Sequence, residues 1–138
     1  MEAKAYLQQI KEHRDRIRLL LEEVEQLRAD AESVSINLDG MPRNGKGTSF
    51  EDVAIKLADY ETKLTNEMAD LWAETMRAHE LIGQISSAQR QQILTKRYIE
   101  GQRWEVIAYE MHMSWQHCFR VHGHALAELD KILERDNM

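Results

Sequence analysis

The sequence is poor in cysteine, proline and glycine, and each shortage narrows the choice of fold. Its single cysteine, Cys118, excludes an internal disulfide and is typical of a reducing compartment. One proline and six glycines in 138 residues leave room for long helices, which the many Leu, Met, Glu and Arg residues favour. The length suits one ordinary domain, or a small domain with a helical extension. We therefore predict an all-α protein.

The sequence also lacks a long apolar run. Its N-terminus, MEAKAYLQQIKEHR, has no basic stretch followed by the apolar segment that a secretory signal needs. No stretch approaches the ~18 apolar residues of a membrane-spanning helix. We therefore expect a cytoplasmic protein that has no membrane partner.

Positive charge is scarce, because 18 Lys and Arg residues stand against 24 Asp and Glu residues. The excess acid is unevenly placed. Residues 1–87 carry 11 basic and 17 acidic side chains, whereas residues 88–138 carry seven of each and four of the six histidines. A neutral segment with few cations is expected to bind nucleic acid weakly and with a shallow salt dependence, through contacts whose placement matters more than the total charge.

Two long apolar stripes predict two helices that cover each other as an antiparallel hairpin over residues 1–85. The alternating spacing of three and four residues places each stripe on one side of its helix. We predict the first helix over residues 3–34. Its stripe is Ala3, Tyr6, Ile10, His13, Ile17, Leu20, Val24, Leu27, Ala31 and Val34. The second stripe is Phe50, Ala54, Leu57, Leu64, Met68, Leu71, Ala78, Ile82 and Ile85. Such a hairpin is typical of a scaffold or a dimerisation arm, so a homodimer is one predicted assembly.

The stretch between the stripes, SINLDGMPRNGKGTS, holds the only proline and three glycines. It predicts a flexible loop over residues 35–49, after which Thr48 and Glu51 form a capping box for the second helix. Its RNGKGTS segment comes close to a phosphate-binding loop but lacks the full GxxxxGK[ST] pattern and a preceding apolar strand. No set of residues resembles a catalytic triad. We therefore expect no enzymatic activity and no cofactor.

The segment 86–138 predicts a second domain of three shorter helices. The first begins at Ser86 or Ser87, with Gln89 placed for a capping box from Ser86, and ends at Gly101 in a left-handed conformation. The second runs from about Arg103 to Met111, and the third from a cap at Ser114 to about Glu134.

The last two of these helices have the spacing of a helix-turn-helix. Ala108 is the small residue that lets the helices cross, and Ile107 and Met111 face inward beside it. A short turn at His112 and Met113 follows. Four residues after the Ser114 cap, Cys118 is predicted to be a buried, valine-sized core residue. Tyr98 and Trp104 are predicted to pack in the same core, although each can also be interpreted as a platform on which bases stack.

The C-terminal segment resembles a known family. RYIEGQRWEVIAYEM and the later VHGHAL are similar to the module of Gram-positive phage and prophage regulators of the RinA/ArpU type, which pair a helical segment with a helix-turn-helix like region four of bacterial sigma factors. The resemblance is sharpest over residues 89–133. It implies a transcriptional regulator that binds promoter DNA, with RNA polymerase as a candidate second partner. The residues that carry it are Arg97, Tyr98, Gly101, Trp104, Ile107, Ala108, Ser114, His122, Gly123, Ala125 and Leu126.

Two positions depart from that family. His112 stands where the family commonly has glycine in the turn, which predicts either a different turn or a left-handed histidine. Trp115, Gln116 and His117 stand where arginines are frequent. Glutamine and histidine can bond base edges, with Gln suited to adenine, and the tryptophan can pack on a sugar, a thymine methyl or the hairpin.

We predict phosphate contacts from the cations near this helix. Lys96 and Arg97 are further candidates, for phosphates or for pairing with the acidic hairpin. Because neutral histidines replace arginines, we also hypothesise that DNA affinity depends on pH near the ordinary histidine pKa of ~6.5. The predicted contacts to double-stranded DNA are Arg103, Trp115, Gln116, His117, Phe119, Arg120, His122 and His124.

Three alternatives stay open from the residues alone. The helix-turn-helix can serve a protein contact, with polymerase or another regulator as partner, or the chain can be an assembly protein whose hairpin is the active part. A zinc site is the third, because Cys118 and His122 lie four residues apart on one helical face. No further ligand motif completes that site, so no metal is expected.

Overall fold

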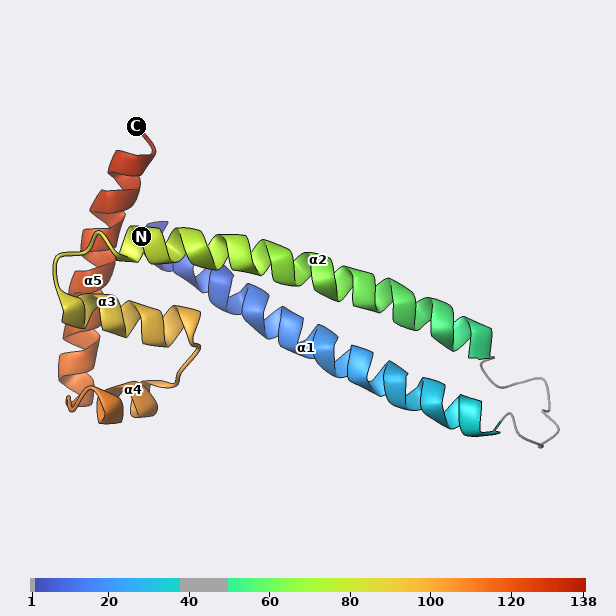
Figure 1. The fold of residues 1–138 in the computed structure, drawn as a ribbon. Helices are drawn as coiled ribbons and strands as arrows, with labels where there is room; N and C mark the ends of the chain where they lie inside the picture. Colours follow the sequence, from blue (N-terminus) through green and yellow to red (C-terminus); the bar gives the residue numbers. More distant parts are fainter. Residues whose placement is uncertain (1, 38–49) are drawn as a thin grey trace. The chain divides into compact units, whose positions relative to one another are not determined.

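The computed structural model describes residues 2–37 and 50–138, and the side chains of all of these except residues 34–37. Within this part the chain forms helices and no strand, which confirms the predicted all-α class (Figure 1). None of the described helices is both long enough and apolar enough to cross a membrane. In chain order the elements are α1 (Glu2–Asn37), α2 (Phe50–Ile82), α3 (Ala88–Leu94), the π-helical turn η1 (Thr95–Ile99), α4 (Trp104–Glu110) and α5 (Trp115–Asp136).

The long helices α1 and α2 form the predicted antiparallel hairpin. Two side-chain pairs join them, His13 with Glu74 and Arg28 with Glu61. From the first pair to the second, the residue number rises along α1 and falls along α2, as in antiparallel helices. Helix α1 continues to Asn37, three residues beyond the predicted end. The proposed cap at Thr48 and most of the proposed loop 35–49 lie outside the described residues.

The chain divides into two compact units, which we describe separately. Unit 1 comprises residues 1–14 and 71–138, and unit 2 comprises residues 15–70. The division differs from the predicted boundary after residue 85. The first turns of α1 and the last turns of α2 belong with the C-terminal helices, because their apolar side chains share one core with α5.

Unit 2 has a thin core made by the facing stripes of two helices. Its buried apolar side chains are Val24, Leu27, Val53 and Leu64. Phe50 and Met68 were predicted in the buried stripe, but both are exposed. Two packed helices bury only a narrow seam, so stripe positions at its margins remain in contact with water.

Unit 1 has a larger core, centred on α5. The start of α1 joins it through Ala3, whose backbone N–H donates to Asp130 Oδ1 at 2.7 Å and so satisfies one of the free donors at a helix N-terminus. The core residues come from all the helices of the unit: Ala3, Leu7, Ile10, Ala78, Leu81, Ile82, Ile85, Ile93, Leu94, Tyr98, Ile99, Ile107, Ala108, Cys118, Val121, Ala125, Leu126, Leu129, Ile132 and Leu133.

Helix α3 begins at one of the two predicted caps, but the capping box and the continuous helix predicted after it are not found. Ser87 is the cap, with its side chain accepting from the Arg90 N–H, and Ser86 makes no capping box with Gln89. Ser86 instead donates its backbone N–H to Glu128 Oε2 at 2.7 Å, which ties the start of α3 to α5. The predicted continuous helix widens into η1, where the Glu100 N–H donates to the Thr95 carbonyl. Gly101 then takes the predicted left-handed conformation, with φ of 71°.

Helices α4 and α5 form the predicted helix-turn-helix. Ile107 and Ala108 are buried on α4, and Cys118 is buried on α5. His112 takes the left-handed conformation in the turn, with φ of 54°, so histidine occupies the position that favours glycine. Ser114 then caps α5 by accepting from the His117 N–H at 3.1 Å.

Candidate nucleic-acid interface

The outer face of α5 is positioned by the buried residues on its inner face. Cys118 and Val121 are buried against the core, whereas Gln116 and Arg120 are exposed. With 3.6 residues per turn, these positions fall on different sides of the helix. The Ser114 cap fixes where the helix begins, so Gln116 lies in the first turn with its side chain in solvent. The sequence-predicted base-reading position is therefore accessible.

An aromatic edge borders this face on the side toward α4. We define the aromatic edge as Trp104, Trp115 and Phe119. The Phe119 ring lies 5.1 Å from the ring of Trp104 and 6.1 Å from that of Trp115, measured between centroids. Trp104 is half-buried against the core, as predicted, but Trp115 and Phe119 remain 47% and 46% exposed. Two large aromatic side chains therefore present an apolar surface to solvent beside Gln116.

His122 is oriented away from the outer face. Its Nε2 lies 2.8 Å from the Tyr98 hydroxyl, and its ring meets the Trp104 ring edge-on at 4.8 Å. Burial lowers the pKa of His122 to about 4, with the nearby charges of Lys4 and Arg97 acting in the same direction. The hypothesis that its protonation tunes DNA affinity near neutral pH is therefore wrong for this residue, because the ring stays neutral there.

Lys96 and Arg97, which precede α4, are both held within the domain. Lys96 Nζ pairs with Glu110 Oε2 at 2.7 Å, and this hydrogen bond raises the pKa of Lys96. The Arg97 guanidinium donates to the Gln102 carbonyl and lies 4.9 Å from the centre of the Trp104 ring. The hydrogen bonds of Lys96 and Arg97 are made to residues near α4 and not to the hairpin. Arg103 Nε lies 3.8 Å from Glu105 Oε2, but the Arg103 side chain is 82% exposed at the start of α4, where it can still reach a ligand.

The predicted structural role of Cys118 agrees with its position. The side chain is buried, and burial raises the pKa of its thiol, which disfavours the reactive thiolate. His122, the other member of the candidate zinc pair, has its Nε2 at the Tyr98 hydroxyl. Within residues 2–37 and 50–138, no three His, Cys, Asp or Glu side chains come together as a set of metal ligands.

A cationic hollow borders the outer face on the side toward α3. We define the cationic hollow as the space of about 380 Å³ lined by α3 and α5. His117 is partly buried there, whereas Arg120 and His124 are exposed. No carboxylate is among the described side chains that line it. The lining residues are Ser86, Ser87, Gln89, Arg90, His117, Arg120, Val121 and His124.

Arg90 and Lys131 were absent from the predicted contacts. Arg90 lines the cationic hollow from α3, and Lys131 lines an adjoining hollow of about 360 Å³ that shares Arg90 and His124 with it. For Lys131 the sequence carried a signal, because it follows His124 by seven residues and so lies on the same helical face. For Arg90 it carried none, since the packing of the start of α3 on α5 is a tertiary feature.

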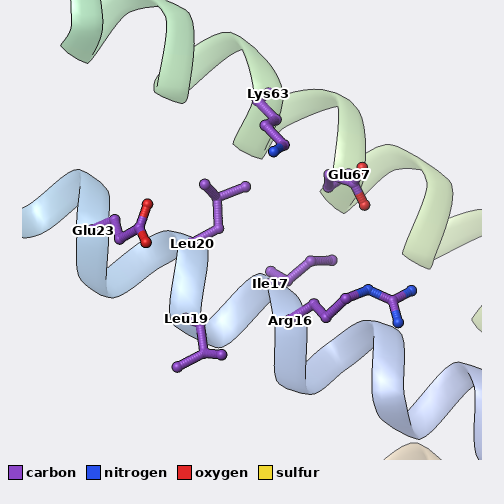
Figure 2. Close-up of a pocket in the computed structure, with 7 residues that line it drawn as sticks. All are labelled: Arg16, Ile17, Leu19, Leu20, Glu23, Lys63 and Glu67. Atoms are coloured by element: carbon purple, nitrogen blue, oxygen red, sulfur yellow. The ribbon is translucent and has the colours of Figure 1, made fainter.

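A hollow on unit 2 has a different character. It measures about 310 Å³ and is lined by two cations and two carboxylates around apolar side chains. Figure 2 shows the Leu20 side chain directed toward α2 and the Leu19 side chain directed away from it. Its charged side chains are Arg16, Lys63, Glu23 and Glu67. This balance gives no preference for an anion, in contrast to the cationic hollow of unit 1.

No protein-family model, curated protein or solved structure matches this chain.

Proposed function

We propose that this chain is a transcriptional regulator of the phage and prophage type that binds promoter double-stranded DNA through α4 and α5. In this role α5 enters the major groove with its first two turns against the bases. RNA polymerase is the proposed second partner, since sigma region four, which the sequence resembles, contacts both promoter and polymerase. The protein acts by binding, without a catalytic step.

The observation that carries the proposal is the orientation of α5. Its inner residues Cys118 and Val121 are buried, and its outer residues Gln116 and Arg120 are exposed after a serine cap. A helix held in this way offers an amide for base edges and a guanidinium for phosphates on one accessible face. Arg103, at the start of α4, adds a cation on the other side of the motif.

Selection of bound duplexes from a random DNA pool tests this proposal. We expect enrichment of a defined sequence by the full chain. With Gln116→Ala, the preference at one or two base positions is expected to relax, at a cost of about 1–3 kcal/mol for a specific contact. A matched control is Gln8→Ala, which changes the same side chain on α1 and is expected to leave the enriched sequence unchanged. If the wild-type chain retains no duplex at low salt, the proposal is wrong.

The aromatic edge supports a second candidate, a protein contact made by the same motif. Tyr109 on α4 is 82% exposed, and Trp115 and Phe119 add apolar surface on α5. Aromatic side chains are enriched at protein interfaces and often carry most of their binding energy. Capture of purified RNA polymerase by the wild-type chain, lost with Tyr109→Ala while duplex binding persists, supports this role. Equal capture by both chains excludes Tyr109 as its anchor.

A homodimer through the hairpin remains part of the proposal. Leu19 and Ile55 in unit 2 are each 62% exposed, so apolar surface is left over after α1 and α2 have packed together. A dimer would favour a two-fold operator with half-sites one helical turn, or a multiple of it, apart. Sedimentation of the wild-type chain and of a Leu19→Ser/Ile55→Ser variant tests this assembly. Equal masses for the two chains, both monomeric, would exclude it.

A further inference from the structure

We infer that the cationic hollow between α3 and α5 is a seat for a phosphate of the DNA backbone, on the opposite side of α5 from the aromatic edge. This inference rests on the proposed DNA-binding function and extends it, because it adds Arg90 of α3 to the interface and assigns the two strands of the duplex to two different sides of the recognition helix.

The two sides of α5 follow from helical geometry. Trp115, Phe119 and His122 lie three or four residues apart, and the last two contact Trp104 of α4. His117, Arg120 and His124 repeat the same spacing and line the hollow with α3. At 3.6 residues per turn the two sets are separated by roughly half a turn. The exposed Gln116 lies between them, so one side can face each edge of the groove that Gln116 enters.

The chemistry of the lining favours an anion. Two arginines and two histidines contribute to it, together with the hydroxyl-bearing Ser86 and Ser87. Arg90 donates from Nη1 to Glu128 Oε1 at 2.9 Å. A guanidinium has five N–H donors, so this one bond leaves capacity for a second acceptor. Arg120 is exposed. The Ser86 hydroxyl already donates to Glu128 Oε1 at 3.3 Å, so the remaining guanidinium N–H groups of Arg90 and Arg120 are the donors that a phosphate in the hollow would use.

DNA is the occupant that the location favours. His117 and Arg120 lie within the first two turns of α5, next to the base-reading position Gln116. The major groove is bounded on both sides by phosphate strands, and protein contacts to them fix the register of a recognition helix. A hollow beside the helix thus lies where a strand must pass. Arg103 has the corresponding place on the α4 side.

The salt dependence of binding to a labelled random-sequence duplex tests the inference. Each lost phosphate contact makes the slope of log affinity against log salt shallower by about 0.9. With Arg120→Gln, the ratio of wild-type to variant affinity is therefore expected to fall about 3.5-fold between about 50 and 200 mM salt. Arg135→Gln removes the same charge from α5, about 22 Å further along the helix, and is expected to leave the slope unchanged.

A second pair of variants removes a negative charge, so the expected change in duplex affinity has the opposite sign. Glu128→Gln removes the carboxylate that engages Arg90, so duplex affinity is expected to rise several-fold at low salt. Glu134→Gln changes net charge equally at an exposed site outside the hollow and is expected to have a smaller effect. Circular dichroism of each variant verifies that it is folded.

The outcomes separate the two proposals. If the wild-type chain does not bind duplex DNA, the proposed function and the phosphate seat are both wrong. If it binds, but the two arginine variants have equal slopes or the two glutamate variants have equal affinities, the effect is one of net charge and the phosphate seat alone is wrong.

Discussion

Unit 1 and unit 2 differ in both charge and core. Unit 1 carries 11 basic and 11 acidic residues, whereas unit 2 carries 7 basic and 13 acidic residues. The whole net charge of −6 therefore belongs to residues 15–70. The helix-turn-helix lies in the neutral unit, so the acidity of the chain as a whole does not describe the surface around α5. Within unit 1 the placement of a few arginines matters more than their number.

The cores differ because the two units pack different numbers of elements. Unit 2 buries a single seam between two helices, while unit 1 packs segments of α1 and α2 with α3, η1, α4 and α5. A side chain at the centre of several elements leaves a larger cavity when it is truncated, since fewer neighbours can move into the space. The two units should therefore respond unequally to the same substitution.

The largest expected effect is the cost of truncating leucine in the two cores. Leu129→Ala in unit 1, where the side chain is completely buried, is expected to cost about 3–5 kcal/mol of unfolding free energy. Leu64→Ala in unit 2, where 8% of the residue is exposed, is expected to cost nearer 2 kcal/mol. Urea unfolding followed by circular dichroism measures both. A larger cost for Leu64→Ala would reverse the ranking of the two cores.

The next effect is a loss of stability in mild acid that arises in unit 1. The pKa of His122 is about 4 in the folded chain and ~6.5 when unfolded, so the unfolded state binds a proton first as pH falls. The stabilisation is present above pH ~6.5 and is lost progressively down to about pH 4. We expect a loss of about 1–2 kcal/mol, discounted for the partial exposure of the ring.

Unfolding of the wild-type chain and of His122→Gln, measured across this pH range, tests that effect. The variant should lack the part of the acid loss between pH ~6.5 and pH ~4.5, above the range where ordinary carboxylates titrate. Parallel curves for the two chains would show that His122 titrates normally, and the ring would then regain a role in pH-dependent binding. Tyr98→Phe removes the hydroxyl beside the ring while keeping it buried, and serves as the matched variant.

A smaller effect concerns the aromatic edge of unit 1. Because this unit has few free cations, we expect apolar contacts to supply part of its specificity, with Trp115 or Phe119 on thymine methyl groups. A selected duplex synthesised with deoxyuridine in place of thymidine lacks those methyls, and should bind about fourfold more weakly for each methyl buried. Phe119→Ala should reduce this difference if that ring makes the contact. Equal binding of both duplexes by the wild-type chain would exclude methyl recognition.

The smallest effect comes from Gly123 on the outer face of α5. A Cβ added there meets nothing within 4 Å, so the fold of the chain does not require glycine at this position. Gly123→Ala is expected to stabilise unit 1 by about 0.5–1 kcal/mol through helix propensity. If DNA approaches this face closely, the same substitution should weaken duplex binding. A more stable variant with unchanged duplex affinity would place the closest approach of DNA elsewhere.

Much of the fold was predictable because it depends on local patterns. Ser114 precedes a periodic apolar stretch and caps α5 as predicted, and Gly101 takes the predicted left-handed conformation. His112 takes the left-handed conformation that was one of the two alternatives predicted for it. The choice of Ser87 over Ser86 was not predictable, since Ser86 has a second use in its bonds to Glu128 of α5. The π-helical turn was missed as well, because the sequence of η1 suits an ordinary helix equally well.

The candidate site was predictable only in part. Gln116, Arg120 and His124 are exposed, as a contact surface requires, whereas His122 packs between Tyr98 and Trp104. From the sequence, His122 and His124 were both predicted to contact DNA, because both follow the cap of the same helix. Two residues along a helix turn a side chain by about 200°, so one ring points into the core and the other into solvent.

By itself, the sequence determined the long helices, the Ser114 cap of α5, the left-handed Gly101, and the apolar faces that pack into a hairpin and a helix-turn-helix. These features depend on residues that are neighbours along the chain, where spacing and backbone preference act directly. Only the tertiary structure decided that the ends of the hairpin share the core of α5, that His122 contacts Tyr98, and that Arg90 and Arg120 line the same hollow. Those features depend on residues far apart in the chain, which packing alone brings together.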